Sequence, residues 1–204
     1  MSLLVNISTL VANSEIRTEV VEGIEFTVLP SKTLPPEIVM NGILYPADDV
    51  KSTINTLDNS PVTMSHPVIG GAFVDAYEPI AQAKFGLGGA FNKVRGQVDD
   101  GRWVVEKYIP SEQLNNTKLG KKLKEAIKNK SPIHTSTGVY LTCIPEIGTN
   151  AMGQEYTSRA KIDRFNHDAI LLNEVGAATP EQGVGIFVNA KGESEETEVM
   201  YVNL

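Results

Sequence analysis

The alternation of apolar and polar side chains predicts β-strands in both halves of the chain. In the N-terminal part, apolar and β-branched residues favour strands at 2–11 and 19–29, and Glu22-Gly23 marks a turn within the second segment. Leu34-Pro35-Pro36 then interrupts any regular element. In the C-terminal part, the same pattern predicts strands at 133–144, 155–165 and 168–173, and a last one near 184–188.

A β-hairpin is predicted between residues 88 and 105. Two apolar segments flank Asp99-Asp100-Gly101, and glycine after aspartate supplies the positive φ that tight turns need. The turn lacks the further alternating oxygen ligands of a calcium loop, so a plain hairpin is expected.

Two helices interrupt the strands. A short one is predicted over Asp48–Leu57, where two aspartates begin the first turn, and a longer one over Ser111–Lys130 with Ser111 as N-cap. The apolar stripe of the longer helix consists of Leu114, Leu119, Leu123 and Ile127. Its lysines are interpreted as a solvated face, with a basic binding patch as the alternative. The elements together predict a mainly β, α+β domain with a barrel-like architecture.

Length, charge and cysteine content limit the protein class. The chain has 204 residues, 41% of them hydrophobic, and a net charge of −7. These values suit one compact domain and disfavour a general nucleic-acid binder. With no apolar run of membrane-spanning length and no secretory signal, a cytoplasmic origin is expected. The single Cys143 excludes an internal disulfide and is interpreted as a small buried residue rather than a nucleophile.

Composition changes near residue 190. Residues 191–198 are acidic and lack core-forming side chains, which is typical of a linker or a mobile tail. We therefore expect one domain over residues 1–190 and an acidic tail or linker remnant over 191–204.

The candidate chemistry lies in one serine and three histidines. His134 lies two residues before Ser136, so both side chains would share a face of a strand. Acyl transfer needs a nucleophile, a base within hydrogen-bond reach and a third group that orients the base. His66 and His167 lie in turn-like surroundings and are candidates for the last two roles, while Gly138 would let a substrate backbone approach the serine.

Structural roles are the alternatives for each of these residues. Ser136 would then be a polar strand residue, His66 a turn cap and His167 a satisfied core histidine. His134 is interpreted mainly as structural. A three-histidine metal site is the other chemical reading, but no two histidines are spaced on one helical turn.

A resemblance to a known family extends this reading. The order His66, then Ser136 in 136–140, then His167 resembles the His–Ser–His arrangement of herpesvirus assemblins. The segments 40–46, 59–67, 136–140 and 166–172 resemble tailed-phage prohead proteases, as an ordered series across roughly residues 20–190.

The resemblance implies a serine endopeptidase on a compact β-barrel surrounded by helices. In it Ser136 would attack the scissile carbonyl, His66 would take its proton and His167 would orient His66, with Asp168 as the reserve candidate. Backbone N–H groups would form the oxyanion hole, and no cofactor or metal is implied. The substrates would be scaffold and coat-protein segments, and the enzyme itself, inside the immature prohead in the host cytoplasm. A homodimer is possible by analogy; no membrane or specific nucleic acid is implied.

The chain departs from the family pattern after the last histidine. Where the family places arginines in a loop, this chain has residues 173–179 without arginine. A catalytically silent head or scaffold-associated protein that keeps the protease fold is therefore the alternative function. A binding module unrelated to capsids is a third, and it predicts that His66 and Ser136 lie far apart.

Overall fold

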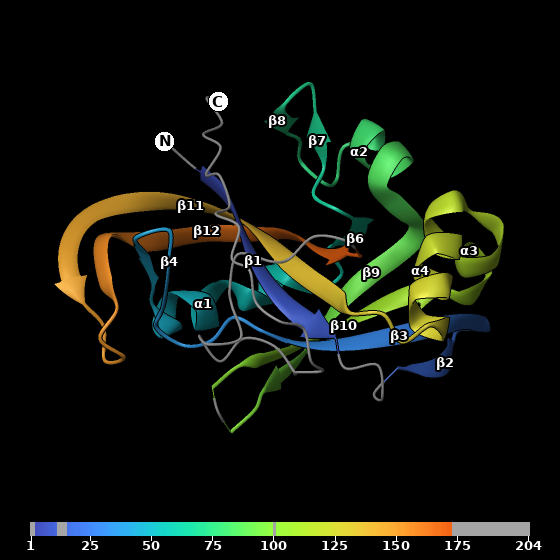
Figure 1. The fold of residues 1–204 in the computed structure, drawn as a ribbon, viewed down its shortest axis with the longest axis horizontal. Helices are drawn as coiled ribbons and strands as arrows, with labels where there is room; N and C mark the ends of the chain where they lie inside the picture. Colours follow the sequence, from blue (N-terminus) through green and yellow to red (C-terminus); the bar gives the residue numbers. More distant parts are fainter. Residues whose placement is uncertain (1–2, 12–15, 100, 173–204) are drawn as a thin grey trace.

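The computed structural model describes residues 3–11 (backbone only), 16–99 and 101–172 (Figure 1). The strands are β1 (Leu3–Val11), β2 (Arg17–Val21), β3 (Ile24–Thr33), β4 (Ile38–Met40), β5 (Ile43–Tyr45), β6 (Pro61–Met64), β7 (Val68–Ile69), β8 (Ala72–Phe73), β9 (Gly86–Gln97), β10 (Trp103–Pro110), β11 (Ile133–Thr149) and β12 (Glu155–Leu171). The helices are α1 (Ala47–Thr53), the 3-10 helix η2 (Ile54–Leu57), α2 (Pro79–Phe85), α3 (Ser111–Asn116) and α4 (Lys118–Lys128).

Strand pairing closes the main sheet into a barrel. The order β11-β1-β3-β10-β9-β6-β12 returns to its start because β11 also pairs with β12. All pairs in this ring are antiparallel except β6 with β12. Outside the ring, β2 pairs with β3. The first part of β12 pairs with β5, and β5 pairs with β4 (Figure 1). The predicted mainly β, barrel-like α+β fold is confirmed.

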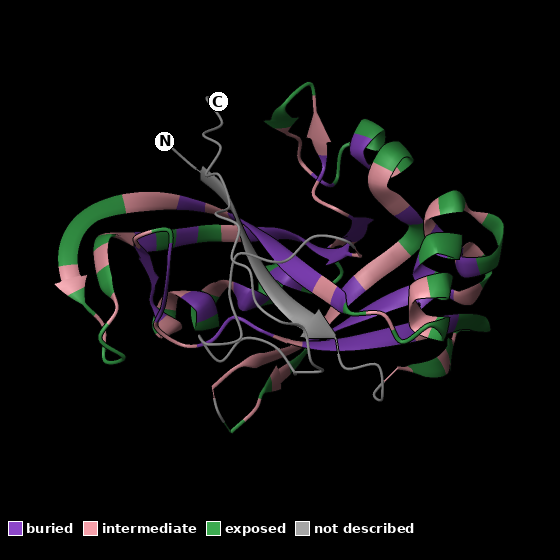
Figure 2. Cartoon of the chain, viewed as in Figure 1, coloured by how far each residue is buried: buried purple, intermediate pink, exposed green. Residues whose placement is uncertain are grey.

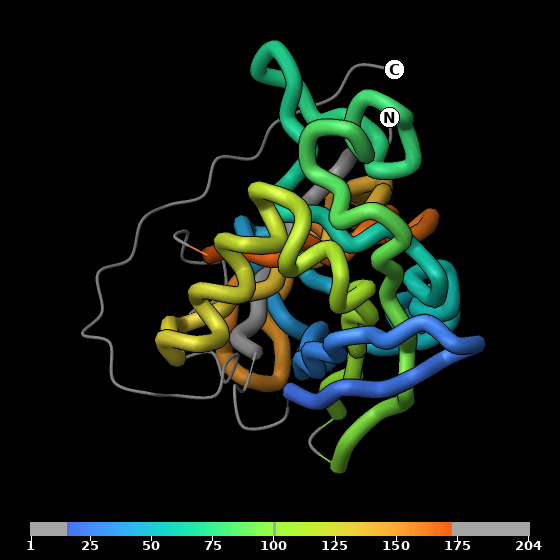
Figure 3. The backbone as a smooth tube through the Cα atoms, turned by 90° about the vertical axis from the view of Figure 1, so that its right-hand side faces the viewer, coloured from blue at the N-terminus to red at the C-terminus, as the bar shows by residue number. Residues whose placement is uncertain are grey.

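Apolar side chains from around the ring fill the barrel, and helices cover parts of its surface. One buried cluster combines Leu29, Val62, Ile109 and Ile170 with Leu114 and Leu123 of α3 and α4. Helices α1 and η2 pack against β12, and α3 packs against β3 and β10. In the ring strands whose burial is described, which leaves out β1, the buried positions follow the strands (Figure 2). Helix α4 lies beside α3 (Figure 3), and its lysines are exposed to solvent.

The predicted helix over Ser111–Lys130 is broken in two at Thr117. This residue has an extended backbone (φ −105°, ψ 155°), and its hydroxyl accepts a hydrogen bond from the Gly120 N–H at 3.0 Å, as an N-cap does. A Cβ at Gly120 would lie 1.9 Å from the carbonyl oxygen of Gln113, so glycine permits the close approach of the two helices. The assignment of Ser111 as N-cap was wrong: it is the first residue of α3, after Pro110.

The strands predicted at 155–165 and 168–173 are one strand, β12, and β11 extends to Thr149. The polar residues that suggested a break lie at a bulge: Gly138 pairs with His167 and Val139 with Phe165, which leaves Asn166 as the extra residue. The short strands β4, β5 and β6, the hairpin β7–β8 and helix α2 were not predicted. The strand predicted near 184–188 and the tail 191–204 lie outside the described residues.

A buried ion pair crosses the barrel interior. The ammonium of Lys107 lies 2.6 Å from the carboxylate of Asp168, and both side chains are fully buried. Lys107 also donates to Ser31 at 2.7 Å, and Thr137 donates to Asp168 at 3.3 Å. Burial lowers the pKa of Lys107, while the charge of Asp168 opposes that shift. The pair is thus satisfied on both sides in a region without solvent.

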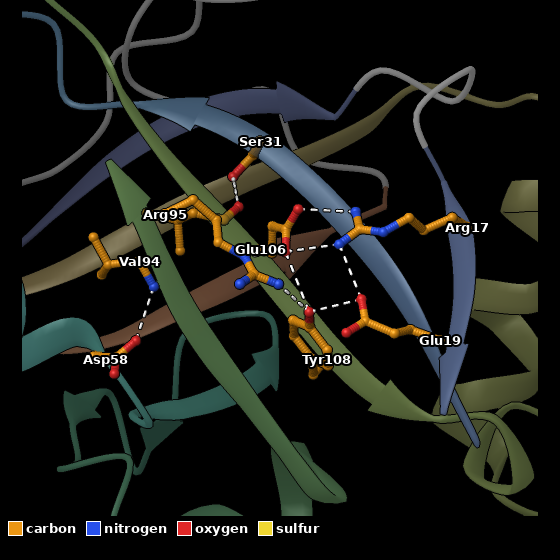
Figure 4. A network of polar contacts seen from close by, with 9 residues as sticks. Arg17, Glu19, Ser31, Asp58, Val94, Arg95, Glu106 and Tyr108 are labelled. Carbon is orange, nitrogen blue, oxygen red and sulfur yellow. Dashed lines mark hydrogen bonds and ion pairs between the residues drawn. The ribbon is translucent and has the colours of Figure 1, made fainter. Parts of the chain in front are cut away.

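A second polar network ties β2 to the barrel exterior (Figure 4). The Glu106 carboxylate accepts hydrogen bonds from Arg17 at 2.9 Å and from Arg95 at 2.6 Å, and Tyr108 donates to Glu19 at 2.9 Å. Burial alone would raise the pKa of Glu106, but these two arginines lower it. The network therefore links β2, β9 and β10.

Replacing one member of the interior ion pair should destabilise the fold strongly. Lys107→Met leaves the Asp168 carboxylate buried without its counter-charge, which should lower the free energy of unfolding by about 3–5 kcal/mol. Urea denaturation measures this loss. The exposed Lys121→Met is the matched control and should change stability by less than about 0.5 kcal/mol.

The double variant Lys107→Met, Asp168→Leu should recover more than half of that loss, because no charge is left unpaired. A single variant as stable as the wild type would contradict the role assigned to the pair.

Candidate active site

Strands β11 and β12 bring the serine and one histidine to the same outer face of the barrel. Ser136 pairs with Ala169, and Gly138 pairs with His167. The His167 ring lies over Gly138, since a Cβ built on this glycine would be 2.3 Å from the ring atom Cε1. Gly138 is therefore required for the ring position, a role different from the predicted one of admitting a substrate backbone.

His66 reaches the same face from the segment after β6. Ser65 has a positive φ of 65°, which turns the chain, and its N–H donates to the carbonyl of Ile170 at 2.9 Å. The Nδ1 atom of His66 lies 2.8 Å from Nε2 of His167, and the ring centroids are 5.1 Å apart. Phe73 of β8 packs edge-on against the His66 ring.

A chain of hydrogen bonds continues behind His167. Its Nδ1 lies 2.8 Å from Oδ1 of Asn166, and the same oxygen accepts the backbone N–H of Ala76 at 3.0 Å. The amide nitrogen of Asn166 donates to Asp75 at 2.7 Å, and Arg164 forms an ion pair with that carboxylate at 2.5 Å. Burial acts to raise the pKa of Asp75, but the hydrogen bonds it accepts lower the pKa overall. This series of hydrogen bonds thus extends from the Asp75–Arg164 ion pair to His66.

These hydrogen bonds fix the proton positions on the rings of His66 and His167. Oδ1 of Asn166 accepts the Ala76 N–H, so it is an oxygen and requires a proton on Nδ1 of His167. Neutral His167 then carries a lone pair on Nε2, which accepts the Nδ1 proton of His66. Nε2 of neutral His66 is consequently unprotonated and can accept a proton from a nucleophile.

Both imidazoles are neutral near pH 7. Burial, and then the neighbouring His167, lower the pKa of His66 well below its usual 6.5. Burial lowers the pKa of His167 to about 4, although the negative charge of Asp75 acts in the opposite direction. Neutral imidazole is the form that a general base needs.

Ser136 is fully buried, and its hydroxyl has no hydrogen-bond partner in the part of the chain that the structure describes. The structure therefore brings His66 and His167 into direct contact. It places Ser136 on the same face, two residues before Gly138 on β11, but without a hydrogen bond between Ser136 and His66.

The other candidates of the sequence analysis have different surroundings. Asp168 points into the barrel, opposite to its neighbour His167, and is paired with Lys107, so it does not orient His66. His134 is half-buried on the face of Ser136, and burial lowers its pKa. Cys143 is half-buried against the core, and burial raises the pKa of its thiol, which makes it a poor nucleophile.

The comparisons with known proteins bear on the fold. No protein-family model and no curated protein matches the chain. Among solved structures, the chain is similar to the bacteriophage T4 capsid assembly protease gp21, with a TM-score of 0.55 and 10% sequence identity, over 82% of this chain and 98% of that one. The chain has the fold of a phage capsid assembly protease. The likeness to assemblins stays a prediction.

The described ranges 16–99 and 101–172 hold no group of three histidine, cysteine, aspartate or glutamate residues that could bind a metal ion. No helix there is long and apolar enough to cross a membrane.

Sequence reasoning missed the residues behind the histidine pair. Asp75 and Arg164 were not singled out, and Asn166 entered only as part of a motif. Asp75 lies 91 residues before Asn166, and nothing in the local pattern connects them. Only the polar Asn166-His167-Asp168 sequence within an apolar strand could have indicated a buried network.

The proton positions make a testable prediction. In long-range ¹H–¹⁵N NMR spectra at pH 7, His66 and His167 should both be neutral and protonated on Nδ1. Since the pKa of His167 is about 4 when folded and 6.5 when unfolded, its contribution to stability is complete above pH 6.5 and is lost as the pH falls through 4.

Asn166→Leu tests the cause, because it removes the acceptor for the His167 proton. The His167 ring should then populate both tautomers while the barrel stays folded. A wild-type His66 protonated on Nε2 at pH 7 would contradict the assigned hydrogen-bond chain.

Proposed function

We propose that the chain is a serine endopeptidase of virus capsid maturation, with Ser136 as nucleophile, His66 as general base and His167 as the residue that orients His66. The observation that carries the proposal is the 2.8 Å contact between Nδ1 of His66 and Nε2 of His167 on the face that holds Ser136. This contact leaves the basic Nε2 of His66 for the serine. The fold shared with the T4 protease supports the reaction class.

The reaction follows from the proton positions. As the Ser136 oxygen attacks the scissile carbonyl, its proton passes to Nε2 of His66, and the resulting imidazolium donates through Nδ1 to His167. Backbone N–H groups would stabilise the oxyanion. The tetrahedral intermediate collapses when His66 returns the proton to the leaving amine. Water, activated by the same base, then hydrolyses the acyl-enzyme.

Asn166 and Asp75 have a positioning role in this proposal. They hold His167 in the tautomer that can accept from His66, and the negative charge of Asp75 favours positive charge developing on the histidine pair. In serine proteases a buried carboxylate beside the base has this function. Here a neutral imidazole and an amide separate the carboxylate from the base.

Substrates, location and organisation follow from the same proposal. The similar T4 protein is a capsid assembly protease, so capsid scaffold and coat-protein segments, and the chain itself, are the proposed substrates inside the immature prohead. The division into a protease domain (1–190) and an acidic tail (191–204), and a possible homodimer, belong to this proposal.

One observation favours a second function. Ser136 is fully buried and its hydroxyl is not bonded to His66, so a substrate reaches it only after this face opens. A catalytically silent head or scaffold-associated protein with the protease fold would need no such opening.

Covalent labelling with an alkyl fluorophosphonate separates the two functions without knowledge of the substrate. The reagent should react with Ser136 of the wild type, as identified by peptide mass spectrometry. Ser136→Ala should lose the label, and His66→Ala should react at least about 10³-fold more slowly, because the serine loses its base. Ser52→Ala, at an exposed serine of helix α1, is the control and should label normally.

A wild type that reacts no faster than Ser136→Ala would contradict the protease and favour the silent protein.

The contact between Gly138 and His167 gives a second test. Gly138→Ala should displace the His167 ring, since the new Cβ would lie 2.3 Å from Cε1, and labelling should slow by roughly 10- to 100-fold. In a background of His167→Ala the same change should add little, because the ring is already absent. Equal effects of Gly138→Ala in both backgrounds would show that it acts by another route.

A further inference from the structure

A row of small side chains crosses the outer face beside the histidine pair. Ser136 of β11, Ala169 of β12 and Thr63 of β6 lie in register, and Gly86 of β9 pairs with Thr63. The neighbours of Thr63 on its strand, Val62 and Met64, belong to the barrel core. Thr63 therefore points outward, as Ser136 and His167 do.

Two buried hydroxyl groups on this row have no partner. Four buried side-chain atoms in the described ranges lack a hydrogen bond, and the Thr63 and Ser136 hydroxyls are two of them. Both residues are fully buried. Inside the barrel, by contrast, Thr137 and Thr33 bond each other at 3.2 Å. Unpartnered buried hydroxyls are rare, because burial removes their hydrogen bonds to water and no protein group compensates for the loss.

Folding does not account for the hydroxyl of Thr63. Valine has the same branched shape and the same preference for strands, and it would fill this position without the unsatisfied group. The unsatisfied oxygen thus destabilises the free protein, and a bound molecule that forms a hydrogen bond with it would remove this penalty.

We infer that Thr63 contacts the substrate: its hydroxyl forms a hydrogen bond with the backbone of an extended peptide whose scissile carbonyl lies at Ser136. The inference rests on the proposed function. Adjacent strands are about 4.8 Å apart, so Thr63 and Ser136 are separated by roughly 10 Å across Ala169. An extended peptide covers this distance with about three residues. Ser136, Ala169 and Thr63 are all fully buried, so the peptide reaches this row only after the face opens, as attack at Ser136 also requires.

Thr63→Val tests the contact. The probe is a peptide library prepared by digesting a bacterial proteome, with cleavage followed by mass spectrometry. For the best-cleaved peptides kcat/KM should fall roughly three- to tenfold, the loss expected for one neutral hydrogen bond. This fall should exceed any change in the rate of fluorophosphonate labelling, because the small reagent does not extend to Thr63.

The melting temperature separates binding from structure. For Thr63→Val it should stay the same or rise by up to about 4 °C, since an unsatisfied hydroxyl is removed. Thr137→Val is the matched control: it removes a bonded, buried hydroxyl from the other face and should lower the melting temperature.

Three results would overturn the inference: unchanged cleavage by Thr63→Val, a lowered melting temperature of that variant, or a labelled wild type that cleaves no peptide of the library. A wild type that is neither labelled nor active would instead overturn the proposed function itself.

Discussion

The antiparallel pairing of β11 with β12 closes the barrel and builds the candidate site in the same step. It sets Gly138 opposite His167 and Ser136 opposite Ala169, and the bulge at Asn166 turns that side chain behind the histidine. The imidazole fits only because Gly138 has no side chain. His66 then depends on β6, which pairs with the other edge of β12. Any change in the register of β12 would therefore separate all of these groups at once.

Successive residues of β12 supply two polar networks on opposite faces. His167 joins the outer chain through Asn166 to Asp75, while Asp168 pairs with Lys107 inside the barrel. Each network satisfies its buried groups, so neither leaves an isolated charge in a region of low dielectric. On this part of the outer face the unsatisfied atoms are the hydroxyls of Ser136 and Thr63. The polar groups around these two hydroxyls are already paired, so the hydroxyls remain available for hydrogen bonds with a ligand.

The sequence predicted the mainly β fold, the strands of the barrel ring other than β6, and the short helix after β5, because alternation and turn residues are local signals. It failed at Thr117, where the helical pattern continues across a break made by tertiary packing of Gly120. His66 and His167 could be singled out because the chain has only three histidines. Their contact, the rejection of Asp168 and the participation of Asp75 depend on pairing between strands far apart in sequence, which no local pattern records.

The contact between serine and base is the central claim, and a crystal structure of the fluorophosphonate adduct tests it most directly. The proposed mechanism predicts phosphorus bonded to Oγ of Ser136, with Nε2 of His66 about 3–4 Å from that oxygen and Nδ1 still on His167. An adduct on another residue, or a His66 ring more than about 8 Å from the Ser136 oxygen, would contradict the mechanism and leave only the shared fold.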